Sequence, residues 1–139
     1  MSQRFDGKKI HLPESEWKRR LSLEEFRVLR EAGTEMPFQN AYFDHKEHGT
    51  YVCAGCELPL FRSEAKYDSG TGWPSFYEPI YPENVAYHED HHLFTPRIEV
   101  VCARCGGHLG HVFDDGPPPT GKRYCMNSIS LIFKAKKYH

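Results

Sequence analysis

The sequence predicts a mainly β protein with short N-terminal helices and a small core held together by zinc. Three observations support this prediction. Helix signals are confined to residues 13–33, short β-rich stretches separated by glycine and proline follow, and two Cys-x-x-Cys pairs occur among those stretches. Four thiolates can surround one Zn²⁺ at about 2.3 Å, and such a staple stabilises a chain too short for a large core.

Length and composition indicate one domain without a nucleic-acid or membrane partner. A chain of 139 residues is long enough for one hydrophobic core and short for two, so we expect one domain over residues 1–139. Charged residues make up 27% and the net charge is −1, which gives no general attraction to nucleic acid or anionic lipid. No apolar run approaches the roughly 18 residues of a membrane span, and no secretory signal opens the chain. We therefore expect a cytoplasmic protein.

Two short helices are expected in the N-terminal part. The first follows Pro13, where acidic residues within 14–16 precede basic residues at 18–20, as the helix dipole favours. The second begins at the capping box Ser22–Glu25, in which the first and last side chains satisfy exposed backbone N–H groups. Gly33 is a suitable residue for ending it.

The apolar residues of the second helix suggest how it packs. Leu21 before the helix and Phe26 within it fit a hydrophobic staple. Leu23, Phe26 and Leu29 recur at helical spacing, which predicts that these three residues share one face of the helix.

Beyond Gly33, the composition favours short strands and turns. β-branched and aromatic residues predict strands at 50–52, 85–87, 97–101 and 128–133. The run Pro117–Pro119 predicts an exposed, rigid turn between the last two strands.

Four cysteines have the spacing of a metal site. The two pairs are separated by 45 residues, a longer interval than the roughly 15–20 residues of a simple zinc ribbon. The zinc would therefore join two distant hairpins. Gly55 and Gly106–Gly107 suit the tight turns at the two pairs. A set of four thiolates predicts a closed, structural Zn²⁺ site, because catalytic zinc keeps an open position. The predicted ligands are Cys53, Cys56, Cys102 and Cys105.

Two alternatives for the cysteine pairs fit less well. A zinc deaminase needs His-x-Glu well upstream of Pro-Cys-x-x-Cys, whereas His45–Glu47 lies just before Cys53 and no proline precedes either pair. A thioredoxin-type redox pair needs a βαβ context that this sequence lacks.

The fifth cysteine, Cys125, has no partner among the metal ligands. In an extended segment, Arg123, Cys125 and Asn127 point to the same side, because side chains alternate along a strand. A neighbouring cation favours the nucleophilic thiolate. Taken alone, Cys125 fits a reactive thiol and a small buried strand residue equally well.

Two further motifs are also open to two interpretations. His108 and His111 follow the second cysteine pair, and Gly110 permits a bulge that would bring the two rings to one side. They could equally lie beside the zinc or on the surface. The glycine-rich segment 69–76 presents Trp73, which could be a core residue or an aromatic wall for a ligand.

Taken together, these segments closely resemble the B-type methionine sulfoxide reductases, which act on the R epimer. The resemblance extends over roughly residues 20–134, and the order of its motifs is specific. The matching segments are the two Cys-x-x-Cys pairs, Ser69–Phe76, Cys105–Phe113 and Arg123–Ser128.

The resemblance implies a fold and a set of residue roles. The family fold has two antiparallel sheets in an open barrel-like arrangement, short N-terminal helices and a zinc site opposite the catalytic face. By resemblance, Cys125 is the nucleophile and Trp73 contacts the ε-methyl group of the substrate. Arg123 would hold the thiolate environment. The residues that would arrange and polarise the sulfoxide oxygen are His108, His111 and Asn127.

The implied reaction repairs oxidised proteins. A thiolate attacks the sulfoxide sulfur, a histidine supplies a proton to the oxygen, and Cys125 becomes a sulfenic acid while methionine leaves. The implied partners are proteins carrying methionine sulfoxide and a thiol reductant such as thioredoxin.

One position departs from the family pattern. Many members have a resolving cysteine in the glycine-rich loop where this chain has Thr71. The other four cysteines are expected to bind zinc, so an external thiol would have to reduce Cys125. A competing interpretation is a zinc-clasped β module that binds a protein partner without catalysis, for which Cys125 and the histidines would be dispensable.

Overall fold

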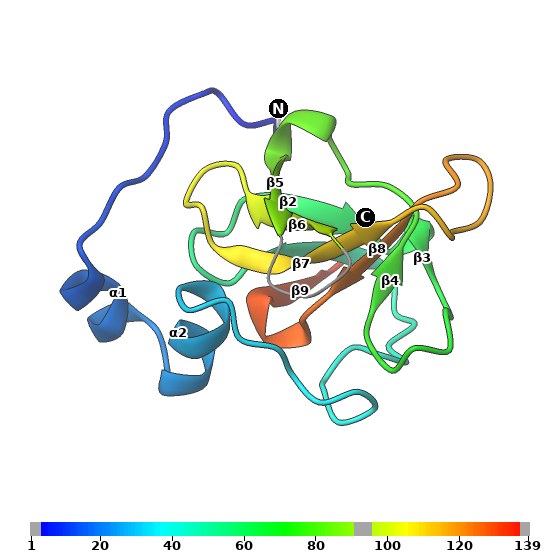
Figure 1. The fold of residues 1–139 in the computed structure, drawn as a ribbon, viewed down its shortest axis with the longest axis horizontal. Helices are drawn as coiled ribbons and strands as arrows, with labels where there is room; N and C mark the ends of the chain where they lie inside the picture. The colour runs from blue at the N-terminus through cyan, green and yellow to red at the C-terminus, as the bar shows by residue number, and fades with distance from the viewer. Residues whose placement is uncertain (1–3, 91–95, 137–139) are drawn as a thin grey trace.

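The computed structural model describes residues 4–90 and 96–136 and has two antiparallel sheets with two short helices beside them (Figure 1). The smaller sheet has the order β2 (Pro59–Arg62), β1 (Gly49–Cys53), β9 (Leu131–Ala135). The larger sheet has the order β3 (Lys66–Tyr67), β4 (Ser75–Phe76), β8 (Arg123–Met126), β7 (His108–Phe113), β6 (Arg97–Cys102), β5 (Val85–Asp90). Short 3₁₀ turns cover Ser63–Ala65, Pro82–Asn84 and Ser128–Ser130. The predicted mainly β class is confirmed.

The two predicted helices are α1 (Glu14–Arg20) and α2 (Leu23–Leu29). The capping box at the start of α2 is complete, because the Ser22 side chain accepts from the Glu25 backbone N–H and the Glu25 side chain accepts from the Ser22 N–H. The predicted shared face is wrong for Leu23, since this side chain is 81% exposed while Phe26 and Leu29 are buried. Residues three apart drift by about 60° round a helix, so Leu23 lies about 120° from Leu29.

The end of α2 differs from the expected stop at Gly33. The helix ends at Leu29, and Ala32 is the residue with left-handed φ (54°). Gly33 instead packs closely against the backbone of Arg27. Its N–H bonds the Arg27 carbonyl at 2.9 Å, and a Cβ at this position would lie 2.9 Å from the same oxygen.

The segment predicted as a strand at 128–133 is half wrong. Ser128–Ser130 form a 3₁₀ turn, and only Leu131 onwards is extended. The chain passes here from β8 in the large sheet to β9 in the small one, so it cannot continue straight. The serine hydroxyls stabilise the turn by donating to other segments, Ser128 to Asn40 Oδ1 at 2.7 Å and Ser130 to the His108 carbonyl at 2.9 Å.

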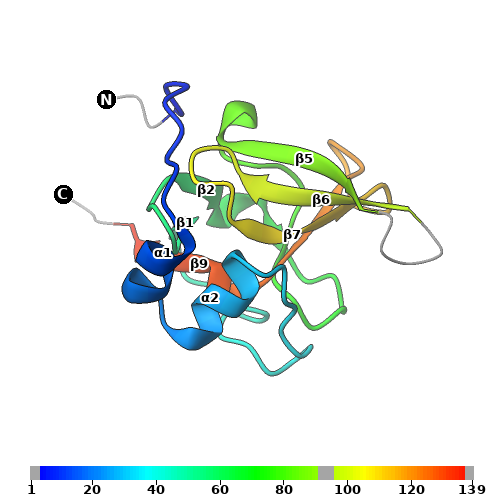
Figure 2. The same ribbon diagram turned by 60° about the vertical axis from the view of Figure 1, so that its left-hand side comes forward.

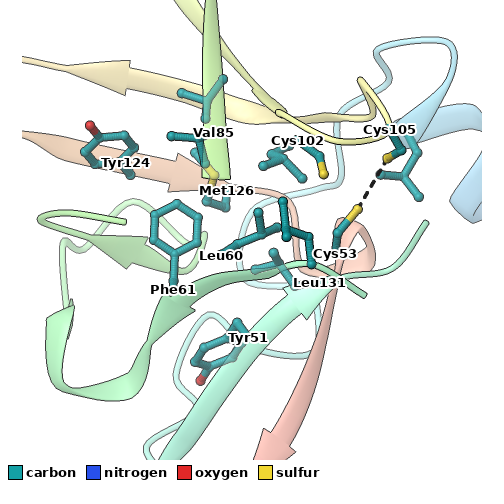
Figure 3. Close-up of a cluster of buried hydrophobic side chains, with 14 of the residues drawn as sticks. Tyr51, Cys53, Leu60, Phe61, Val85, Cys102, Cys105, Tyr124, Met126 and Leu131 are labelled. Carbon is teal, nitrogen blue, oxygen red and sulfur yellow. Dashed lines mark hydrogen bonds between the residues drawn. The ribbon is translucent and has the colours of Figure 1, made fainter. Parts of the chain in front are cut away.

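The hydrophobic core lies between the two sheets (Figure 3). Phe61 of β2 and Phe76 of β4 are fully buried and stack with ring centroids 4.4 Å apart. Leu60 from the small sheet and Met126 from the large one are buried in the same cluster. Aromatic and aliphatic contacts of this kind hold the large sheet against the small sheet.

Both helices lie on one side of the molecule, next to β7 and β9 (Figure 2). Trp17 of α1 and Leu29 of α2 are buried in the common core. No helix within 4–90 and 96–136 has the length and apolar character that a membrane crossing needs.

Candidate functional site

The four predicted metal ligands lie together. Their sulfur atoms are all within 4.8 Å of one another, with Cys53 and Cys105 separated by 3.6 Å and Cys56 and Cys102 by 3.5 Å. A tetrahedron of sulfurs at about 2.3 Å from a zinc ion has edges of about 3.8 Å. We call this group, made of Cys53, Cys56, Cys102 and Cys105, the four-sulfur cluster; its geometry fits a metal ion.

Each cysteine pair forms the turn of a hairpin, and the two turns share one geometry. In both, the residue after the second cysteine has left-handed φ, namely Glu57 (64°) and Gly106 (74°). The N–H of that residue donates to the carbonyl of the first cysteine, at 2.7 and 2.9 Å. The expectation for Gly106 is met, whereas Gly55 has another function. A Cβ on Gly55 would lie 3.3 Å from the Cys105 sulfur, so glycine leaves room for the cluster.

The charge around the four-sulfur cluster favours a bound cation. Neighbouring thiols, together with burial, raise the pKa of Cys53 well above its usual range, so four thiolates cannot coexist there without compensation. Arg104 and Arg30 anchor the same loops by donating to the carbonyls of Cys56 (2.5 Å) and Cys105 (2.8 Å). Their guanidinium groups add positive charge beside the sulfurs.

The remaining predicted site residues, except His108, line one cavity of about 320 Å³. Its wall includes Trp73, His111, Arg123, Cys125 and Asn127. Among the described residues that line this cavity, none belongs to the four-sulfur cluster. The thiol of Cys125 is therefore separated from the other four.

Strand pairing sets the arrangement of the cavity. Along β8, Tyr124 and Met126 are buried in the core while Arg123 and Cys125 are half-buried, which is the alternation that the sequence predicts. In the β7–β8 ladder His111 is directly opposite Cys125. Residues opposite each other in an antiparallel pair have Cβ atoms about 5 Å apart, so the imidazole and the thiol are neighbours.

A bulge in β7 brings His108 next to His111. Val100 of β6 pairs with Gly110 and Val101 with His108, so Leu109 is the extra residue. The two imidazole centroids are 5.5 Å apart. His108 is only 4% exposed and does not line the cavity, so it lies behind His111.

Gly110 is required by the close contact between β7 and β8. A Cβ on this residue would lie 2.1 Å from the Cys125 carbonyl oxygen and 2.9 Å from the Met126 Cα. Glycine therefore lets the strand with the histidines approach the strand with the thiol.

Each histidine contacts a carboxylate. His108 Nδ1 lies 2.7 Å from Glu99 Oε2, and His111 Nε2 lies 2.8 Å from Asp90 Oδ2, which also pairs with Arg97 at 3.0 Å. Burial lowers the pKa of His111 and outweighs the opposite effect of Asp90. The imidazole is therefore mainly neutral at pH 7 and positioned by a fixed acceptor.

The thiol of Cys125 is also shifted toward its neutral form. Burial raises its pKa, and this effect outweighs those of the Arg123 guanidinium and the Thr71 hydroxyl, which both favour thiolate. The predicted influence of Arg123 is thus present but does not determine the net shift. The guanidinium is itself engaged by Asp115 (2.8 and 3.1 Å) and stacks on the Phe113 ring at 4.3 Å.

The backbone of Glu35 connects Trp73 with Asn127. The indole N–H donates to the Glu35 carbonyl at 3.0 Å, and the Glu35 N–H donates to the Asn127 side-chain oxygen at 2.9 Å. The Asn127 amide nitrogen donates to the Leu109 carbonyl at 3.2 Å. Asn127 therefore holds the bulge of β7 and the segment at Glu35 in position beside the cavity.

Sequence reasoning missed the acidic residues of the site. Asp90, Glu99 and Asp115 contact His111, His108 and Arg123. Asp90 comes from β5 and Glu99 from β6, and finding them needs the register of β5 with β6 and of β6 with β7. Asp115 faces Arg123 across the 114–122 turn. The sequence signal for this pair is an acidic residue before the turn and a basic residue after it.

Comparisons with known proteins identify close relatives. Residues 21–135 match the SelR domain family. The chain is 55% identical over 130 residues to the peptide methionine sulfoxide reductase MsrB of Methanosarcina barkeri, covering 94% of this chain and 92% of the relative. It is 56% identical over 125 residues to MsrB of Methanosarcina mazei (90% and 89%) and 49% identical over 126 residues to MsrB of Agrobacterium fabrum (91% and 93%).

The contact between Asp90 and His111 leads to a pH prediction. Asp90→Asn removes the carboxylate that favours the imidazolium and that pairs with Arg97, so the pKa of His111 should fall further. An NMR titration of the His111 ring protons measures this shift. Glu83→Gln, at an exposed ion pair with Arg4, is the control and should leave His111 unchanged. A raised or unaltered His111 pKa in Asp90→Asn would contradict the prediction.

Proposed function

This chain belongs to the methionine sulfoxide reductase B family, which reduces methionine-R-sulfoxide in proteins, and we propose that Cys125 is its nucleophile. The observation behind this assignment is the single cavity in which a thiol separated from the metal ligands lies opposite an imidazole and beside an indole. A nucleophile, a proton donor and an apolar surface are the groups that sulfoxide reduction requires.

We propose a reaction in which the proton of the Cys125 thiol ends on the substrate oxygen. Burial favours a neutral thiol at Cys125 and a neutral imidazole at His111. The proton leaving the thiol passes to the imidazole and then to the sulfoxide oxygen. The Cys125 sulfur attacks the substrate sulfur and forms an S–S bond. The protonated oxygen then moves from the substrate sulfur to the Cys125 sulfur as the S–S and substrate S–O bonds break, which leaves methionine and Cys125 sulfenic acid. The sulfoxide gains two electrons and the cysteine loses two.

The surrounding residues supply orientation. The Trp73 indole would pack against the ε-methyl group, which directs the oxygen toward His111 in one epimer only. His108, held by Glu99, would orient the His111 ring through their contact. Asn127 would shape the oxygen pocket, and Arg123 would stabilise the thiolate as it forms.

We propose that the four-sulfur cluster holds one structural Zn²⁺, because four thiolates at tetrahedral separations suit this ion. The ion would supply a cross-link between two hairpins, and the reaction itself would proceed in the other cavity. We also propose that the chain is one reductase domain that works in a reducing cytoplasm on oxidised proteins, with thioredoxin or another thiol as reductant.

Replacing the nucleophile tests the proposed function. Cys125→Ser exchanges a strong nucleophile for a weak one without altering volume greatly, so turnover should vanish while the fold persists. The assay uses separated epimers of a methionine sulfoxide peptide with dithiothreitol, and circular dichroism monitors the fold. The wild type should reduce only the R epimer. Equal rates on both epimers, or activity of Cys125→Ser, would refute the assignment.

Metal content tests the cluster. Reduced, purified protein should contain one zinc per chain, and Cys53→Ser should lose it together with several kcal/mol of stability, since metal binding and folding are coupled. Elemental analysis and denaturant unfolding give both quantities. A protein without zinc whose stability is unaffected by Cys53→Ser would disprove the prediction.

The separation of Cys125 from the cluster predicts its recycling. With Thr71 in the glycine-rich loop and the other thiols in a closed site, no second sulfur is free for attack. One equivalent of substrate without reductant should leave a sulfenic acid that dimedone traps. Intact mass and peptide mapping check this outcome, and a disulfide between Cys125 and a cluster cysteine would show it to be wrong.

A further inference from the structure

A second cavity, of about 470 Å³, adjoins the one around Cys125 and shares Trp73 with it. We call it the flanking groove. Its walls come from Phe38, residues 43–48, residues 63–64, residues 66–68, Gly70, Gly72 and Trp73. The proposed reaction takes place in the cavity of Cys125 and uses none of these residues apart from Trp73.

The flanking groove presents an exposed aromatic wall. Phe38 is 58% exposed and stands edge-on to Phe43, with ring centroids 5.6 Å apart. Its φ of 62° is left-handed, which is costly for a bulky residue and found mainly where the surroundings impose it. The surroundings here are Gly72, whose carbonyl accepts from the Phe38 N–H at 2.8 Å, and which has no side chain to displace the phenyl ring.

The rim of the flanking groove is acidic. Four exposed carboxylates line it, against two lysines. One lysine, Lys66, is half-buried and lies 3.5 Å from the Phe43 carbonyl, so its charge does not reach the solvent freely. The groove therefore combines an apolar wall with negative potential at its edge. The carboxylates are those of Asp44, Glu47, Glu64 and Asp68.

We propose that the flanking groove binds the part of the substrate polypeptide next to the oxidised methionine, and favours an apolar or aromatic side chain accompanied by a basic one. This inference rests on the proposed function and adds a substrate preference to it. Trp73 is the wall common to both cavities, so a polypeptide whose sulfoxide faces Cys125 can continue past the indole into the flanking groove. Aromatic contacts and complementary charge are the usual sources of binding energy at such surfaces.

The preference can support catalysis as well as binding. Contacts made away from the reacting sulfur can hold it against Cys125 and so raise kcat/KM for polypeptides over free methionine sulfoxide. Small sulfoxides would fill the cavity of Cys125 and leave the flanking groove unused.

The experiment compares N-acetyl-methionine-R-sulfoxide amide with peptides in which phenylalanine, lysine or glutamate is placed one to four positions on either side of the sulfoxide. A peptide with phenylalanine and lysine at the preferred positions should exceed its glutamate counterpart about fivefold in kcat/KM at low salt, the size expected for exposed charge pairs. The difference should shrink as salt is raised.

Variants test whether the flanking groove is the source of this substrate preference. Phe38→Ala should lower kcat/KM for the phenylalanine peptide by about three- to tenfold, and Asp44→Asn with Glu47→Gln should reduce the lysine advantage by about half, because two of the four carboxylates remain. Neither should change the rate on the small sulfoxide. Leu23→Ala and Glu31→Gln, exposed residues outside the groove, are the matched controls and should leave every rate unchanged.

The outcomes separate the two hypotheses. No turnover of the small R sulfoxide would overturn the proposed function itself. Normal turnover of the small sulfoxide, with no dependence on flanking residues or with a preference that is unchanged in Phe38→Ala and in the double charge variant, would overturn only the role of the flanking groove.

Discussion

The four-sulfur cluster is the constraint on which the structure depends. One cysteine pair turns the β1–β2 hairpin of the small sheet, and the other turns the β6–β7 hairpin of the large sheet. The cluster therefore joins the two sheets at one edge of the core. Trp17 lies beside the first turn and Leu29 beside the second, so the helices cover the cluster. A metal ion bound by the cluster would stabilise a core of this size, because it would hold together two hairpins distant in sequence.

The cluster also determines where the groups that line the cavity of Cys125 lie. β7 begins at His108, three positions after Cys105, so its register is set close to a fixed point. The bulge at Leu109 then turns His108 toward His111, and Gly110 allows β7 to approach β8. As a result His111 lies opposite Cys125. Functional groups on paired strands are positioned more precisely than groups on loops, because backbone ladders fix them.

Burial gives the cavity its chemical character. The same exclusion of water raises the pKa of Cys125 and lowers that of His111. Burial therefore favours a neutral thiol at Cys125 and a neutral imidazole at His111. Arg123 and Thr71 oppose the first shift, and Asp90 opposes the second. Formation of the thiolate and the imidazolium is therefore unfavourable at rest and is assisted by groups already in place. A low-dielectric cavity makes each of these contacts stronger than it would be in water.

By itself the sequence determined the class of the protein, the four cysteines of the four-sulfur cluster, the capping box of α2 and the alternation of Arg123, Cys125 and Asn127, because these depend on local spacing. The sequence predicted that Gly110 permits a bulge, but the pairing of β6 with β7 decided that Leu109 is the extra residue. The burial of α2, the 3₁₀ turn at Ser128–Ser130 and the acidic partners Asp90, Glu99 and Asp115 were decided only by tertiary structure. Each depends on which segments, distant in the chain, pack together and exclude water, and local periodicity contains no information about that.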